Sequence, residues 1–152
     1  MEIIVYQDQS DLLIDESSVE DVVREVLSFK KIIHGEIIFH FVTKEHITDL
    51  HGQFFQDPTP TDCITFPIDD IASEQSPILG EIFICPKVGM EYCKKNPYSE
   101  ITLYVIHGIL HLLGFDDLNE KDRLEMRKAE NEVLTHLSKK NLVILSPNLV
   151  NK

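Results

Sequence analysis

The fold of this chain is decided by one stretch, His107-Gly108-Ile109-Leu110-His111-Leu112-Leu113-Gly114-Phe115-Asp116-Asp117. Histidines four residues apart on a helix lie on the same face, so the rings of His107 and His111 can reach one point. Gly114 suits the left-handed conformation that ends many helices, after which the chain can return with a third group. Two imidazoles and a carboxylate, with a fourth position open, are the ligands of a catalytic zinc-type site. The stretch therefore predicts a metal site built for hydrolysis.

The surroundings of the two histidines predict a buried helix. Apolar residues occupy nearly every side of it: Ile101, Leu103, Val105, Ile106, Ile109, Leu110, Leu112, Leu113 and Phe115. A buried imidazole without a partner costs about 1–3 kcal/mol, and a shared metal would satisfy both rings. The pattern therefore favours a metal over the alternative, which is two unrelated histidine side chains.

Gly108 limits the kinds of reaction that a metal site at these histidines is expected to catalyse. Metalloproteases of the His-Glu-x-x-His type carry a general-base glutamate directly after the first histidine, and this chain has Gly108 at that position. A glycine in mid-helix also costs about 1 kcal/mol relative to alanine. It indicates either that something approaches the backbone there or that the helix packs closely on a neighbour. Either way, peptide hydrolysis is disfavoured.

Composition limits the remaining classes. The three cysteines form no Cys-x-x-Cys pair, the chain has no long apolar run, and its first residues lack the basic start of a signal peptide. We therefore expect a cytoplasmic protein with reduced cysteines and no membrane association. The net charge of −12 argues against general nucleic-acid binding. Two basic clusters are either solvated helix faces or local RNA-binding strips: Lys87, Lys94 and Lys95, and Arg123, Arg127 and Lys128.

The pattern of apolar residues predicts an α+β fold in a single compact domain over residues 1–152, with the placement of the tail 140–152 left open. A small mixed β-sheet is expected to pack against several helices, including the buried metal-bearing helix. The predicted strands are Ile3–Tyr6, Glu36–Val42, Cys63–Phe66 and Leu79–Cys85. Four helices are predicted. The first begins at a capping box of Ser17 and Glu20, and the second spans Lys44–Phe55. The third contains the stretch from His107 to Leu113, and the fourth is amphipathic and includes Met126 to Leu137. An acidic loop through Asp69, Asp70, Glu74 and Pro77 joins the last two strands, and the apolar run Leu142–Leu145 could dock as a further strand.

Three motifs follow one another along the chain: Pro60-Thr61-Asp62-Cys63-Ile64-Thr65-Phe66-Pro67, Leu79-Gly80-Glu81-Ile82, and the stretch from His107 to Asp116. In this order and spacing they resemble the YbeY family of ribosomal RNA maturation factors, which are metal-dependent proteins described as single-strand endoribonucleases. The family's corresponding segments read Pro-Thr-Asp-Val-Leu-Ser-Phe-Pro, Leu-Gly-Asp-Ile and His-Gly-x-Leu-His-Leu-x-Gly-[Tyr/Phe]-Asp-His. The resemblance extends from about Ile3 to Leu137.

Two positions depart from the family pattern. The family's third metal ligand is a histidine, and this chain has Asp117 there, which keeps a ligand but changes its charge. The alternative for Asp117 is that it caps the following helix, with Asp116 or water completing the coordination. The family also carries an arginine before the Pro-Thr-Asp segment, and the matching residue here is Phe55. That change removes a cation able to hold a phosphate bidentately.

The resemblance implies a metal-dependent endoribonuclease that matures the 3′ end of 16S ribosomal RNA and takes part in ribosome quality control. His107, His111 and Asp117 would be both the metal ligands and the catalytic residues, with one Zn²⁺ as the expected cofactor, although other divalent transition metals fit. Glu81 and Asp116 are candidates to orient the ligands or a water. The expected partners are single-stranded ribosomal RNA and the ribosome or its proteins. The oligomeric state is left open.

Two other functions compete with this one. The first is a ribosome-associated assembly factor whose metal is structural and which cleaves nothing, a reading that Phe55 and the acidic charge favour. The second is a metal hydrolase of a non-nucleic substrate such as a peptide or small ester, which Gly108 disfavours. A fourth metal position filled by a protein side chain would favour the assembly factor over an enzyme.

Overall fold

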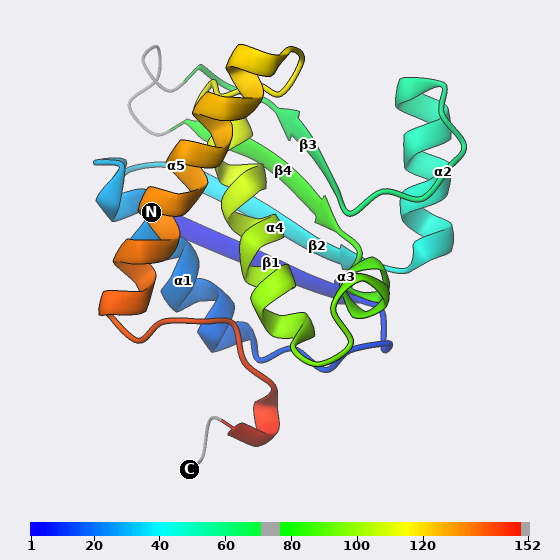
Figure 1. Ribbon diagram of the computed structural model, residues 1–152, viewed down its shortest axis with the longest axis horizontal. Coiled ribbons are helices and arrows are strands. Elements are labelled where there is room, and N and C mark those ends of the chain that lie inside the picture. The colour runs from blue at the N-terminus through cyan, green and yellow to red at the C-terminus, as the bar shows by residue number, and fades with distance from the viewer. Residues whose placement is uncertain (71–76, 150–152) are drawn as a thin grey trace.

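The computed structural model describes residues 1–70 and 77–149 and shows strands and helices mixed along the chain, with three helices in succession after the last strand (Figure 1). The elements are β1 (Glu2–Asp8), α1 (Glu16–Phe29), β2 (Glu36–Val42), α2 (Lys44–Phe55), β3 (Cys63–Pro67), β4 (Ile78–Ile84), α3 (Pro86–Tyr92), α4 (Pro97–Leu112), α5 (Glu120–Lys139) and the 3-10 turn Pro147–Leu149. Within the described residues, the strands form one sheet in the order β1-β2-β4-β3. β1, β2 and β4 are parallel and β3 is antiparallel to β4, so the predicted mixed sheet is confirmed.

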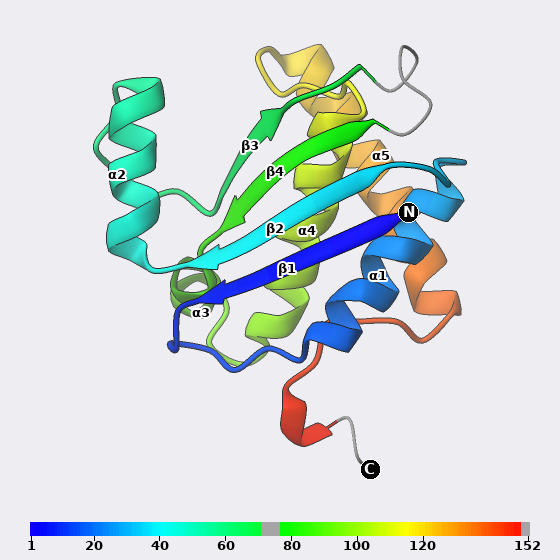
Figure 2. The same ribbon diagram turned by 180° about the vertical axis from the view of Figure 1, so that it is seen from behind.

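Helices α1, α4 and α5 lie on one face of the sheet (Figure 1). The core between these layers contains the fully buried Phe39 and Phe41 of β2 and Ile82 of β4, beneath Val105 and Ile109 of α4. Figure 2 shows the opposite face of the sheet, beside which α2 stands. The α+β class and the central place of the metal-bearing helix are as the sequence predicted.

Two glycines bring α4 onto β4. A Cβ atom on Gly108 would lie 2.8 Å from Cγ2 of Ile82 and 3.3 Å from Sγ of Cys63. A Cβ atom on Gly80 of β4 would lie 2.6 Å from Cδ2 of Leu112 on α4. Of the two explanations for a mid-helix glycine, close helix packing is therefore the one that the structure supports. The helix is held against the strands at the level of the two histidines.

The sequence analysis erred at the start of α1 and omitted one short helix. Asp15, and not Ser17, is the N-cap of α1: its carboxylate accepts a hydrogen bond from the Ser18 amide at 2.8 Å and from the Ser17 hydroxyl at 2.7 Å. Aspartate caps as well as serine, so the capping box pattern was displaced by a nearby competitor. The short helix α3 was missed, because seven residues starting at Pro86 are too few for a periodic apolar pattern.

The C-terminal tail, whose placement the sequence left open, packs on the helices, and Leu142–Leu145 does not join the sheet as a further strand. Ile144 is fully buried, and its amide donates to the Thr102 hydroxyl at 3.1 Å. The amide of Leu145 donates to the Ser18 hydroxyl at 2.9 Å. Side-chain hydroxyls thus satisfy the amides that a neighbouring strand would otherwise pair. Glu74 of the predicted acidic loop and the last three residues of the tail lie outside the described residues. Among the described helices, none has the length and apolarity to span a bilayer.

Candidate metal centre

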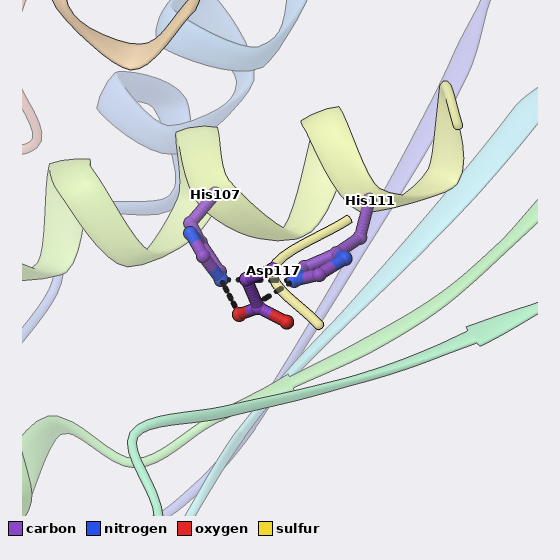
Figure 3. A group of neighbouring side chains, drawn as sticks. All are labelled: His107, His111 and Asp117. Carbon is purple, nitrogen blue, oxygen red and sulfur yellow. Dashed lines mark hydrogen bonds and ion pairs between the residues drawn. The ribbon is translucent and has the colours of Figure 1, made fainter. Parts of the chain in front are cut away.

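His107 and His111 lie one turn apart near the end of α4 and point to the same spot (Figure 3). Their Nε2 atoms are 2.9 Å apart. Oδ2 of Asp117 lies 3.6 Å from Nε2 of His107 and 3.6 Å from Nε2 of His111. The sequence-predicted trio is therefore brought together in the structure, with all three side chains partly exposed.

The turn after α4 carries Asp117 back to the histidines. Gly114 has a φ of 102°, a region that favours glycine, and its amide donates to the His111 carbonyl at 3.1 Å. The next amide, that of Phe115, reaches back to the Leu110 carbonyl at 3.0 Å. These bonds satisfy carbonyls at the helix end and reverse the chain. Asn119, whose side chain accepts from the Asp122 amide at 2.8 Å, is the N-cap of α5, so the capping role proposed for Asp117 belongs to another residue.

The donor set fits a divalent metal. Given the three distances between them, the donor atoms of His107, His111 and Asp117 are all about 2.0 Å from one common point, which is the bond length of zinc to imidazole nitrogen and carboxylate oxygen. Over the residues that the structure describes, no fourth histidine, cysteine or acidic side chain joins this group. A four-coordinate ion held by these three side chains would therefore have one position left for water or substrate.

Glu130 of α5 contacts the ring nitrogen of His107 that faces away from the other two side chains. Its carboxylate oxygen Oε2 lies 3.3 Å from Nδ1 of His107, and its side chain is only 13% exposed. A carboxylate on Nδ1 holds the proton there and leaves the Nε2 lone pair facing the other ligands, as is usual for metal-binding histidines. Sequence reasoning missed Glu130. Its position four residues after Met126 and three before Val133 places it at the edge of the buried stripe of α5, which was a usable signal.

Negative charge collects around His107. Burial by itself lowers the pKa of His107, but the hydrogen bond to Glu130 and the charges of Glu130, Asp62 and Asp117 together raise the pKa above its usual value. The carboxylates that raise the pKa of an imidazole also stabilise a cation beside it. The centre is therefore electrostatically suited to a divalent ion.

Other candidate residues lie outside the group. Glu81 projects from the face of β4 opposite to its neighbours Gly80 and Ile82, which contact α4, and its carboxylate lies 3.5 Å from Nε2 of His40. Asp116 is exposed and does not belong to the cluster. Phe55 ends α2 with 53% of its surface exposed, where its ring lies 6.3 Å from that of Phe66. The orienting role suggested for Glu81 does not fit its position.

An α+β fold in which two histidines of a central helix and a nearby aspartate could together hold a metal is the arrangement expected of a small metal-dependent hydrolase. A family model described as Endoribonuclease YbeY matches residues 4–138. The Endoribonuclease YbeY of Protochlamydia amoebophila is 43% identical over 140 residues, covering 90% of this chain and 93% of that protein. That of Chlamydia muridarum is 35% identical over 151 residues, covering 96% and 93%.

Similarity extends to a solved structure. The solution structure of a Thermotoga maritima protein matches with a TM-score of 0.56 and 25% identity, covering 91% of this chain and 93% of that one. The chain belongs to the YbeY family, whose members are named endoribonucleases and are thus hydrolases.

Proposed function

We propose that this protein is a metal-dependent endoribonuclease that cleaves single-stranded RNA in ribosomal RNA processing. The observation that carries the proposal is the group of His107, His111 and Asp117, which has the spacing of a metal site with one open position, in a chain of the YbeY family. Membership of the family supports RNA as the substrate class.

In this proposal, His107, His111 and Asp117 are the metal ligands and the catalytic residues. Oε2 of Glu130 lies 3.3 Å from Nδ1 of His107 and keeps a proton on that nitrogen, so that Nε2 is free to bind the metal. When bound, the ion supplies a Lewis acid for a phosphoryl oxygen and a water of lowered pKa. Zn²⁺ is the preferred ion because two imidazoles and one carboxylate at these separations suit it.

We further propose the cellular role that the family resemblance implies. The substrate is the 3′ end of 16S ribosomal RNA, the protein takes part in ribosome quality control in the cytoplasm, and it contacts the ribosome or its proteins there. The domain spans residues 1–152. Support comes from the family match, which covers residues 4–138.

The competing functions have less support. A structural metal in a non-cleaving assembly factor would be expected to have four protein ligands, whereas three side chains gather in the described part of the chain. A peptidase of the His-Glu-x-x-His type needs a base at the position of Gly108, and packing against Ile82 leaves no room for a side chain there.

The test is cleavage of defined substrates by the metal-loaded protein. We expect slow cleavage of single-stranded RNA that stops with a chelator and with His111→Ala, and no cleavage of unstructured peptides. His46→Ala is the matched control, since His46 is an exposed histidine on α2 outside the cluster. RNA cleavage that survives His111→Ala, or peptide cleavage that His111→Ala eliminates, would contradict the proposal.

A further inference from the structure

A groove runs along the outer side of α5, away from the core. It has a volume of about 700 Å³ and is lined by residues that include Phe29 at the end of α1 and Leu124, Arg127, Lys128, His136 and Lys139 of α5; we call it the α5 groove. From Leu124 to Lys139 the helix extends about 22 Å. Figure 1 shows α5 lying across the front of the molecule with α1 beside it. Neither the metal ligands nor Glu130 line this groove.

The α5 groove is basic in an acidic protein. Against a net charge of −12 for the chain, its lining carries Arg127, Lys128 and Lys139 and one carboxylate, that of Glu132. Within the residues that the structure describes, none of these three cations forms an ion pair. Unpaired cations grouped along one groove remain available to a row of phosphates.

An aromatic surface lies at one end of the α5 groove. Phe29 is 38% exposed, and its ring stacks on that of His136 with 4.3 Å between the centroids. The orientation of the His136 ring is fixed by a contact of 2.8 Å between its Nε2 and Oε1 of Glu25. A fixed and partly exposed aromatic ring next to cations is the arrangement on which unpaired bases stack. A double helix keeps its bases stacked internally, so this feature favours a single strand.

Two further cations lie close both to the α5 groove and to the turn that carries Asp117. Nη1 of Arg123, one turn before Arg127 on α5, lies 3.4 Å from the carbonyl oxygen of Asp117. On the other side, Nζ of Lys30 lies 5.9 Å from the centroid of Phe29 and 5.3 Å from that of Phe115. Phe115 is two residues from Asp117, so Lys30 lies near the groove residue Phe29 and near this turn.

We infer that the α5 groove is a second RNA-binding site, which holds the single strand outside the centre formed by His107, His111 and Asp117. Arg127, Lys128 and Lys139 contact phosphates, and Phe29 stacks on a base. This inference rests on the proposed endoribonuclease function. It explains how a chain with Phe55 in place of the family's arginine and a strong negative charge retains RNA: the strand is held by a local cationic groove.

The test compares two charge-neutralised variants of the full-length, metal-loaded protein by fluorescence anisotropy. Arg127→Gln/Lys128→Gln removes two groove cations while keeping good helix formers. Lys94→Gln/Lys95→Gln is the control, which makes the same charge change beyond the opposite end of α4. Single-stranded RNA of about 16 nucleotides and of about 4 nucleotides is used, spanning the site sizes of single-strand binders, with its integrity checked after each measurement.

For the longer RNA, we expect the groove variant to bind about tenfold more weakly. The negative slope of log K against log salt should become shallower by about 1.4, which is about 0.7 for each lost phosphate contact. The control variant should bind like the wild type. In cleavage, the groove variant should raise KM for the longer RNA and leave kcat and the cleavage of the shorter RNA unchanged. Phe29→Leu should weaken binding about fivefold with an unaltered salt slope.

Equal weakening by both charge variants would overturn the inference, because it would show a general effect of net charge. Wild-type binding by the groove variant would overturn it as well. Polyglutamate that competes with RNA of equal charge, in a manner that depends on Arg127 and Lys128, would assign the groove to an acidic protein segment instead. If the wild type cleaves no RNA but the groove variant alone loses binding, the endoribonuclease function fails and the second binding site stands.

Discussion

Asp117 sets the charge of the candidate metal centre. An aspartate in place of a neutral histidine lowers the formal charge of a divalent site from about +2 to about +1, which makes a bound water less acidic. A carboxylate is also a harder ligand than imidazole, so the site should accept manganese or iron better than a site of three histidines. Its carboxylate lies 3.6 Å from both Nε2 atoms, and Asn119 takes the capping role at the next helix.

Substitution of Asp117 tests this role. We expect Asp117→Ala to loosen the metal markedly, and Asp117→His to retain the metal and move the pH–activity profile to lower pH, because a more positive site acidifies the water. Asp116→Ala is the matched control and should bind metal like the wild type, since Asp116 lies outside the cluster. Zinc affinity measured by competition with a chelator gives the answer. Tight zinc binding by Asp117→Ala would show that Asp117 is not a ligand.

Glu130 tunes His107, and its removal should change the pH dependence of metal binding. In the metal-free protein the pKa of His107 lies above its usual value, so a proton competes with the metal and affinity falls as the pH drops through this raised pKa. Glu130→Gln removes the charge, so the pKa of His107 should fall and the loss of affinity should begin at lower pH. At neutral pH, affinity should drop by about 10–100-fold, because the ring is less firmly oriented.

Nuclear magnetic resonance titration of His107 in the metal-free protein measures the pKa directly. Glu132→Gln serves as the control, because it removes the same charge from the same helix at an exposed position. An unchanged pKa of His107 in Glu130→Gln would contradict the account.

At the scale of elements, the contact between α4 and β4 fixes the position of α4, the helix that carries His107 and His111. A Cβ atom on Gly108 would lie 2.8 Å from Cγ2 and 3.1 Å from Cδ1 of Ile82. Overpacking costs about 1–3 kcal/mol, whereas the gain in helix propensity is about 1 kcal/mol. We therefore expect Gly108→Ala to lower the free energy of unfolding by up to about 2 kcal/mol, as measured by urea denaturation.

Two comparisons isolate the packing effect. Gly52→Ala in α2 places its Cβ atom 3.5 Å from Pro58, an ordinary contact, so this variant should be neutral or stabilising. In an Ile82→Ala background, where both close carbon atoms are absent, the cost of Gly108→Ala should shrink. A stabilising Gly108→Ala in the wild-type background would mean that the contact does not hold the helix in place.

The success of the sequence analysis differed from element to element. His107 and His111 could be paired because helical spacing alone determines which face a residue occupies. The tail could not be placed, since its amides bond to the hydroxyls of Thr102 and Ser18, and no local pattern reveals such distant partners. Glu130 was missed for the same reason: its contact with His107 depends on how α5 packs on α4.

Over the whole molecule, acidic side chains gather at the candidate metal centre and basic side chains gather at the α5 groove. Carboxylates of Glu130, Asp62 and Asp117 surround His107, whereas the α5 groove carries unpaired cations along the outer side of the helix that supplies Glu130. In the two proposals made above, the inner side of α5 would orient a metal ligand and its outer side would bind RNA. The sequence offered Arg127 and Lys128 as part of a possible RNA-binding strip, but it could not add Phe29, His136 and Lys139 to them, because only the packing of α1 beside α5 brings these residues together.

Metal content is the measurement that tests the central claim most directly. The full-length protein, stripped and reconstituted with zinc, should retain about one equivalent in elemental analysis after removal of excess metal. His107→Ala and His111→Ala should each lose stoichiometric loading, while His46→Ala should keep it. A reconstituted wild type without bound metal, or full loading in both cluster variants, would contradict the assignment of this centre.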